Sequence, residues 1–336
     1  MPISNVSFLG SSQAQIARLK DLNSTLVDLQ RQIASRKKHE TLAGFGLDAN
    51  SVLRDRTSKN RVDSYLANID TVTTRINAMN AALQSARDAA LQVIDGITTA
   101  VRDSSADVDA LAKLAKNALN FIHDLANTQI DGRYLFAGTN TTRPPSVDKS
   151  TMNANYQTQI NDWMNGTITT AQLQANVAAF TTTDLGLDPA LSTAGSVTIR
   201  IDNATELDYT ALADQDGFQE MIRALGLMAN MRAPGPGDTP TTGDVGDILQ
   251  TVLKTARAGV DQLDAAATQL GLNFNLIKEV QSSHQRDSAV FEGLIGDAED
   301  ADTTEVVTQI QLLQTQLQAS YEVTRLVSDL SLVNFL

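Results

Sequence analysis

The sequence of 336 residues has no cysteine and three histidines, His39, His123 and His284. Without cysteine there are no disulfides, thiolate zinc sites, iron–sulfur clusters or cysteine nucleophiles. Three histidines spread along the chain argue against a histidine-rich metal centre or a histidine proton relay. We expect no metal site and no cofactor, and we propose no residue as catalytic.

Aromatic residues are also scarce, at 4% with one Trp, although 42% of residues are hydrophobic. Because aromatic rings supply much of the buried area of large compact cores, an apolar content of Ala, Val, Ile and Leu favours long helices with narrow apolar stripes. The sequence has no run of 18 apolar residues, and its first 20 residues lack a basic segment followed by an apolar one. We expect neither a transmembrane helix nor a conventional signal peptide.

Positive charge is in deficit, since 26 Lys and Arg stand against 39 Asp and Glu, for a formal net charge of −13. This charge argues against binding to nucleic acid or to an anionic membrane surface. A cysteine-free chain without a signal peptide is either cytoplasmic or exported by a route that recognises another signal.

Apolar residues recur at alternating spacings of three and four, the pattern of a helix with one apolar stripe. The longest uninterrupted stripe covers 62–100, where every stripe position from Val62 to Ala100 is apolar. A helix of that length is about 58 Å long and needs a partner along its whole extent. The stretch 108–125 is the predicted antiparallel partner, and another long stripe covers 249–298.

Both ends of the chain carry shorter stripes, over 16–33 and from 306 onward. A mostly polar helix of 18 residues is marginal alone in water, so we predict that both ends are disordered in the free monomer and become ordered within an assembly. The predicted assembly interface consists of the stripe residues of the two ends, namely Ile16, Leu19, Leu22, Leu26, Leu29, Ile33, Val306, Ile310, Leu313, Leu317 and Leu330.

The composition changes near 141, where Pro144 and Pro145 end the helical pattern. From there to 243 the chain is rich in Thr, Asn, Asp and Gly. Alternation over 197–201 predicts a strand, 206–209 a second strand and 218–228 a short helix. Before this segment, a turn at Asp131–Gly132 leads into a predicted short strand over 133–138.

The predicted fold class is mainly α, with long antiparallel coiled-coil-like helices from both chain ends and an inserted α+β domain. We expect five segments. They are an N-terminal inner helix and loop over 1–50, a long helical hairpin and short strand over 51–140, the inserted outward-facing domain over 141–243, a C-terminal long helix over 244–300 and a C-terminal inner helix over 301–336.

Charge is unevenly distributed along the chain. Residues 31–61 contain eight bases against three acids, whereas 287–305 contain seven acids and neither Lys nor Arg. Two separate solvated surfaces would explain this equally well. Our hypothesis is that the stretches face each other, within one subunit or between neighbours, with Lys37, Lys38, Asp300 and Asp302 as a possible charge-paired contact.

Other polar groups favour structural roles. The acidic residues over 297–305 lack the spacing of a calcium loop, and Asp302 with Glu305 resembles a capping box at the start of the last helix. His284 falls on a stripe and His123 follows one, so both are interpreted as residues that fix helix register. Carboxylate pairs for hydrolysis remain open in the middle segment, where no spacing singles out a pair.

Two segments resemble the bacterial flagellin superfamily. Residues 126–139, from Ala126-Asn127-Thr128 through Gly132-Arg133-Tyr134-Leu135-Phe136 to Thr139, are similar to a motif of that family, and Glu299-Asp300-Ala301-Asp302 with Glu305 is similar to its junction into the last helix. The final residues, 317–321 and 330–336, are most similar to the hook–filament junction proteins of that superfamily.

This resemblance implies a structural protein of the bacterial flagellum, secreted unfolded by the flagellar type III export apparatus with an export chaperone. It implies self-assembly in a ring or layer between an adjoining hook-associated protein and flagellin. Filament flagellin is the nearest alternative. The alternatives of another class are an enzyme housed in the middle domain and a cytoplasmic coiled-coil scaffold.

Overall fold

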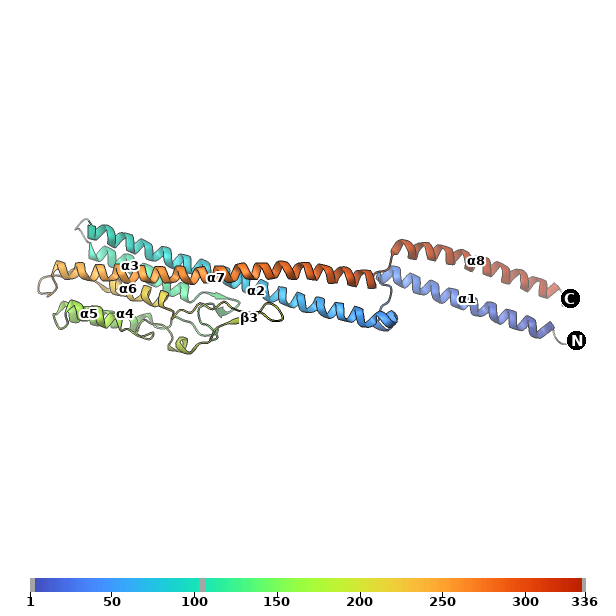
Figure 1. Cartoon of the computed structure of the whole chain (residues 1–336), viewed down its shortest axis with the longest axis horizontal. Helices are drawn as coiled ribbons and strands as arrows, with labels where there is room; N and C mark the ends of the chain where they lie inside the picture. The colour runs from blue at the N-terminus through green and yellow to red at the C-terminus, as the bar shows by residue number, and fades with distance from the viewer. Residues whose placement is uncertain (1–3, 103–106, 334–336) are drawn as a thin grey trace. The chain divides into compact units, whose positions relative to one another are not determined.

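The computed structural model describes the backbone of residues 4–102 and 107–333, and the side chains of 13–102, 107–215 and 217–326. The described part is mainly α, as predicted from the sequence (Figure 1). Its α-helices are α1 (Ser4–Ser35), α2 (Ala49–Arg102), α3 (Val108–Ala126), α4 (Lys149–Met164), α5 (Thr170–Ala178), α6 (Asp216–Asn230), α7 (Thr242–Glu299) and α8 (Thr303–Val333).

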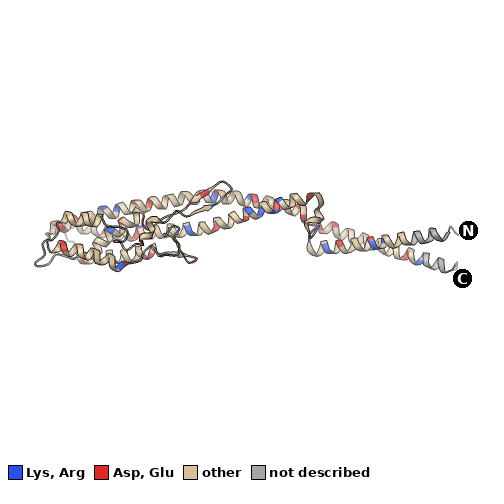
Figure 2. Ribbon diagram, turned by 90° about the horizontal axis from the view of Figure 1, so that it is seen from below, with Lys and Arg blue, Asp and Glu red and all other residues tan. Residues whose placement is uncertain are grey.

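The remaining regular elements are short. Two 3-10 helices are η1 (Leu42–Asp48) and η2 (Pro189–Thr193). Two antiparallel two-stranded sheets pair β1 (Gln129–Ile130) with β2 (Arg133–Tyr134), and β3 (Thr198–Arg200) with β4 (Glu206–Asp208). Figure 2 shows Lys and Arg interspersed with Asp and Glu along the helices.

The chain forms two compact units. One contains Met1–Asp63 and His284–Leu336, so both chain ends belong to it, and the other contains Ser64–Ser283. Helices α2 and α7 each contribute residues to both units, which are described separately below. The five-segment division expected from the sequence stays a prediction.

The core of the second unit forms along the stripe predicted in α2. Its members from 69 to 97 are at most 1% exposed, namely Ile69, Val72, Ile76, Met79, Leu83, Ala86, Ala90, Val93 and Ile97. Helix α3 begins at an Asp107 cap, whose carboxylate accepts a hydrogen bond from the Ala110 amide at 2.9 Å. A Cβ on Gly96 of α2 would meet the Leu111 and Leu114 side chains of α3 at 3.3 and 3.4 Å, so the two helices pack closely there.

Residues 141–243 share this core. The predicted strands form β3 and β4, with Ile199 opposite Leu207. Helix α6 packs against α3, and its buried Ile222 and Leu225 belong to the same apolar cluster as the α2 stripe. The segment predicted as an inserted α+β domain thus buries its apolar side chains together with the long helices.

Two helices of this segment were not predicted, although the buried Met152, Tyr156, Ile160 and Trp163 of α4 recur at the helical spacings of four, four and three. Helix α4 begins at Asp148, whose carboxylate accepts from the Thr151 amide, and α5 begins at a capping box formed by Thr169 and Gln172. These caps satisfy amides that the first helical turn leaves unpaired. The buried residues of α4 include Tyr156 and the one Trp of the chain, Trp163.

The hairpin β1–β2 turns at Asp131 and Gly132, as predicted. Both residues have positive φ, 52° and 71°, as a type I′ turn requires. The predicted strand over 133–138 is wrong beyond Tyr134. The chain leaves the sheet there because Phe136 turns into the core, where its ring packs edge-on against Phe218 with centroids 5.2 Å apart.

His123 of α3 is fully buried. Its Nδ1 lies 2.8 Å from Ser146 Oγ and its Nε2 lies 3.1 Å from Met152 Sδ, and burial lowers its pKa from 6.5 to about 4. The Asn127 side chain accepts from the Ser146 amide at 2.8 Å and donates to its carbonyl at 2.9 Å. These bonds fix the end of α3 against the segment that leads into α4.

Candidate assembly interface

The terminal helices α1 and α8 pack against each other within the first unit (Figure 1). Leu29 of α1 and Val306 and Leu313 of α8 are at most 9% exposed and form the centre of a small apolar cluster. Half-buried side chains complete this cluster, namely Leu22, Leu26, Ile33, Ala301 and Ile310. The stripes at the two ends of the sequence are thus partners within one subunit.

The other predicted interface residues lie outside this cluster. Leu317 is buried, and Leu19 lines a shallow groove between α1 and α8 together with Val323. Ile16 is 65% exposed. The side chain of Leu330 lies outside the described residues.

Helix α8 has a second apolar stripe, which faces solvent. Leu312, Val323 and Leu326 are 60%, 50% and 52% exposed, and Ala319 is exposed between them. At about 100° per residue these positions share one side of the helix, away from Val306 and Leu313. Positions 312, 319, 323 and 326 are separated by seven, four and three residues, which is a heptad spacing. The interface predicted from the sequence contains instead the stripe of Val306, Ile310, Leu313 and Leu317. A soluble helix with two apolar sides offers one to a further partner.

At the base of the pair, the segment after α1 and the segment before α8 form a short antiparallel bridge between Lys37 and Asp300. The Lys38 amide donates to the Glu299 carbonyl at 2.7 Å, and the Ala301 amide donates to the Arg36 carbonyl at 3.0 Å. Arg36 has a positive φ of 57°, a left-handed conformation that a non-glycine residue rarely adopts. The backbone hydrogen bonds across the Lys37–Asp300 bridge therefore keep Arg36 in a conformation that is unfavourable for a residue with a side chain.

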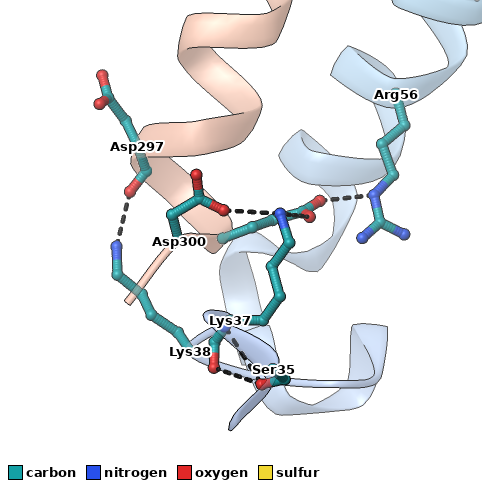
Figure 3. Close-up of polar contacts among 7 residues, drawn as sticks. Ser35, Lys37, Lys38, Arg56, Asp297 and Asp300 are labelled. Atoms are coloured by element: carbon teal, nitrogen blue, oxygen red, sulfur yellow. Dashed lines mark hydrogen bonds and ion pairs between the residues drawn. The ribbon is translucent and has the colours of Figure 1, made fainter. Parts of the chain in front are cut away.

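Side chains reinforce this bridge around one buried carboxylate (Figure 3). Glu299 is 3% exposed, and its Oε1 accepts from Arg56 Nε at 2.5 Å while Lys37 Nζ lies 3.3 Å from its Oε2. The hydrogen bond from Arg56, followed by that from Lys37, lowers the pKa of Glu299 below its usual range. The carboxylate is ionised and doubly paired, as a buried charge must be.

Lys37 also pairs with Asp300, at 2.7 Å between Nζ and Oδ1. This hydrogen bond is the main cause that raises the pKa of Lys37. We name the group of Lys37, Arg56, Glu299 and Asp300 the clasp. It joins the exit of α1 and the start of α2 to the junction between α7 and α8.

The structure brings together part of the charge-paired contact expected from the sequence. Lys37 meets Asp300, whereas Lys38 Nζ donates to the main-chain oxygen of Asp297 at 2.6 Å. Asp302 caps α8, accepting from the Thr304 and Glu305 amides at 2.9 and 3.2 Å. Sequence reasoning missed Arg56 and Glu299 as partners, although they lie within the basic and acidic stretches, because composition does not indicate which charge is buried.

In the part of the chain that the structure describes, no group of three or more His, Asp or Glu side chains is arranged to hold a metal ion. No described helix is long and apolar enough to cross a membrane.

No protein-family model matches this sequence, and none of the curated proteins matches it. Among solved structures, the fold is similar to that of a putative flagellar hook-associated protein from Vibrio parahaemolyticus. The TM-score is 0.55 at 14% identity, and the match covers 76% of this chain and 100% of that chain. FlgL from Bacillus cereus aligns with a TM-score of 0.48 at 14% identity, over 73% of this chain and 98% of that chain. The likeness to the Vibrio protein establishes a shared, mainly helical fold.

Proposed function

We propose that this chain is a structural protein of the bacterial flagellum that forms a layer by packing its terminal helices against neighbouring subunits. The observation that carries this proposal is the second apolar stripe of α8, because Leu312, Val323 and Leu326 remain exposed although α8 already packs on α1. Stripes of this kind become buried when further helices pack beside them.

Two further observations support a flagellar role. The similar Vibrio structure is described as a putative flagellar hook-associated protein. The segments 126–139 and 299–305 resemble motifs of the flagellin superfamily, and the end of the chain is most similar to the hook–filament junction proteins. We therefore favour a junction layer between hook and filament, with an adjoining hook-associated protein and flagellin as neighbours.

This role implies how the chain would be exported and how it would become ordered on assembly. The chain would be secreted through the flagellar type III export apparatus with an export chaperone, and its terminal helices would become ordered on assembly. The export route follows from the resemblance, and ordering on assembly is supported by the small size of the apolar cluster between α1 and α8, which contains three buried side chains.

The test is a deletion of the gene in the bacterium that encodes it, with complementation by the full chain. We expect the deletion strain to retain hooks, lose filaments and swim again when complemented, with the tagged chain localised at the hook tip. A deletion strain with normal filaments would contradict the proposal.

Filament flagellin is the second candidate, because the superfamily resemblance covers it as well. Seeding distinguishes the two roles. A filament flagellin added to filament fragments extends them into long filaments, whereas a junction protein does not extend itself. An enzyme in the middle segment would instead require a specific reaction by the full chain, lost on substitution within 141–243.

A further inference from the structure

An apolar side chain projects from the turn that precedes α2. Leu47 is 99% exposed, in a 3-10 helix that is kinked at Gly46, where φ is 56° and ψ is −117°. Leu53, in the first turns of α2, is 48% exposed. A single exposed leucine is ordinary in a soluble protein, so the significance of Leu47 depends on what lies around it.

A groove of about 530 Å³ lies beside this turn, within the same unit. Its apolar lining includes Phe45, the buried Val52 and Leu294 of α7, which is 48% exposed. Val290, one turn before Leu294, is 60% exposed and extends the apolar side of α7. Leu47 does not line the groove, so it does not fill the groove of its own chain.

The rim of the groove is acidic. Asp48, Asp55 and Asp297 line it, and among the described residues the side chains of these three form no ion pair. Lys38 also lines the groove, but its ammonium group donates to the main-chain oxygen of Asp297. Figure 3 shows the Asp297 carboxylate directed away from the clasp. The carboxylates of Asp48, Asp55 and Asp297 are therefore available to pair with a cation of another molecule.

Cations lie on the other side of the start of α2. At about 100° per residue, Leu53, Arg54 and Arg61 occupy the side of α2 opposite Val52 and Asp55. Arg54 is exposed, and within the described ranges neither Arg54 nor Arg61 forms an ion pair. One copy thus presents unpaired arginines on one side of α2 and an apolar groove with unpaired carboxylates on the other, and the exposed Leu47 precedes both in the chain.

We propose that Leu47 of one copy inserts into this groove of a second copy, with Arg54 of the first copy against the acidic rim. Complementary surfaces on different sides of one chain make a heterologous contact, which repeats from copy to copy and closes into a ring or continues as a helix. The proposal rests on the proposed function, in which copies are neighbours, and it adds the contact between them.

Cross-linking tests this contact, because the chain has no native cysteine. Purified Leu47→Cys and Leu294→Cys chains are mixed and oxidised. The quantity measured is the mixed disulfide between the two variants, not the homodimer of either one. We expect its yield to be roughly tenfold above that of the mixed disulfide between Leu272→Cys and Leu294→Cys chains, because disulfides require Cα atoms within about 7 Å. Leu272 is a matched control, since it is 59% exposed and lies in the other unit.

A charge exchange adds a second readout. Arg54→Glu in the Leu47→Cys chain should lower the yield several-fold, and Asp55→Arg in the Leu294→Cys chain should restore it. Circular dichroism verifies that each variant remains helical. Equal yields from the test and control mixtures, or a yield that the charge exchange does not change, would overturn the contact.

The outcomes separate this inference from the proposed function. Absence of the dimer, in a chain that restores swimming to the deletion strain, removes the contact and leaves the flagellar role. A specific dimer from a chain whose deletion leaves filaments normal removes the flagellar role and leaves the contact. A cross-link from Leu294→Cys in isolated flagella to a different protein, in place of a second copy, also overturns the inference.

Discussion

Arg56 and Glu299 are 243 residues apart in the sequence, and their side chains form an ion pair with 2.5 Å between Nε and Oε1. Glu299 is buried whereas Arg56 is about half exposed, so the pair anchors a solvated cation to an enclosed carboxylate. Because Lys37 contacts the same carboxylate, the clasp depends on both ends of the chain. It forms where the terminal helix pair meets the rest of its unit.

Replacing Glu299 by Gln should loosen the clasp. The variant keeps the size of the side chain and removes its charge, so the unit should lose about 1–2 kcal/mol after allowance for the exposure of both cations. Hydrogen exchange measures this at the Lys38 and Ala301 amides, which bond across the bridge. Glu322→Gln is the control, because its pair with Arg325 is exposed on both sides. Equal exchange in the two variants would contradict a role of Glu299.

The same variant has a defined pH dependence. The pKa of Glu299 is lower in the folded chain than its ordinary value of 4.5, so its contribution to stability is present above pH 4.5 and is lost as the pH falls through the folded-state pKa. The difference in unfolding free energy between wild type and Glu299→Gln should therefore be largest near neutral pH and shrink in acid. A difference that grows on acidification would show the opposite linkage.

Leu312 and Leu313 are neighbours with different expected roles. Leu313→Ala removes a buried side chain between α1 and α8, so it should cost the helix pair about 2 kcal/mol and raise amide exchange in both helices. Leu312→Ala, on the exposed stripe, should change exchange by less than about 0.5 kcal/mol.

Assembly should show the reverse preference. Leu312→Asp should leave the pair intact and prevent incorporation of the chain into flagella, as observed by immunolabelling of the complemented deletion strain. Normal incorporation of Leu312→Asp would remove the argument from the second stripe.

The buried His123 should make the stability of the fold sensitive to acid. Its pKa of about 4 lies below the ordinary 6.5, so protons bind the unfolded chain more tightly and stability is lost as the pH falls from 6.5 towards 4. By pH 5 this amounts to about 2 kcal/mol. Urea unfolding at pH 7.5 and pH 5 should show wild type losing about that much more than His123→Gln. Parallel losses in the two proteins would contradict the assignment.

Gly226 allows a close approach in the core. A Cβ at this position would overlap the ring of Tyr156, which is fully buried and donates from its hydroxyl to the Ile222 carbonyl at 3.0 Å. Gly226→Ala should therefore destabilise the fold by about 1–3 kcal/mol. Gly271→Ala in α7 is the control, since a Cβ there meets nothing within 4 Å and should stabilise the helix by up to about 1 kcal/mol. Thermal unfolding of the two variants compares them.

Helices with a long regular stripe were predictable, whereas two short helices of the middle segment were missed. Periodicity located the core of α2, α3 and α6, but it placed the start of α2 at 62 and not at 49. The first turns of α2 are polar apart from the buried Val52 and the exposed Leu53, so they carry no repeating apolar stripe. Helices α4 and α5 were missed because they are short and lie in a segment rich in Thr, Asn and Asp, although Met152, Tyr156, Ile160 and Trp163 of α4 do recur at helical spacing.

The candidate interface was also predictable only in part. The stripes that contain Leu29 in α1 and Leu313 in α8 were predictable, because alternating spacings place each residue on the apolar face of its own helix. Their packing within one subunit was not, since a stripe has the same form whether its partner belongs to the same chain or to another. The disorder predicted for the free ends stays a prediction for hydrogen exchange to test.

Three features could be predicted from the order of the amino acids alone, namely the mainly helical class, the apolar stripes and the separation of a basic from an acidic stretch. These depend on composition and on spacings of a few residues, which one helix expresses directly. Only the folded chain shows which stripe is covered, which carboxylate among seven is buried against Arg56, and that Leu47 is exposed. Burial and ion pairing depend on groups brought together from distant parts of the chain, and no local pattern encodes that distance.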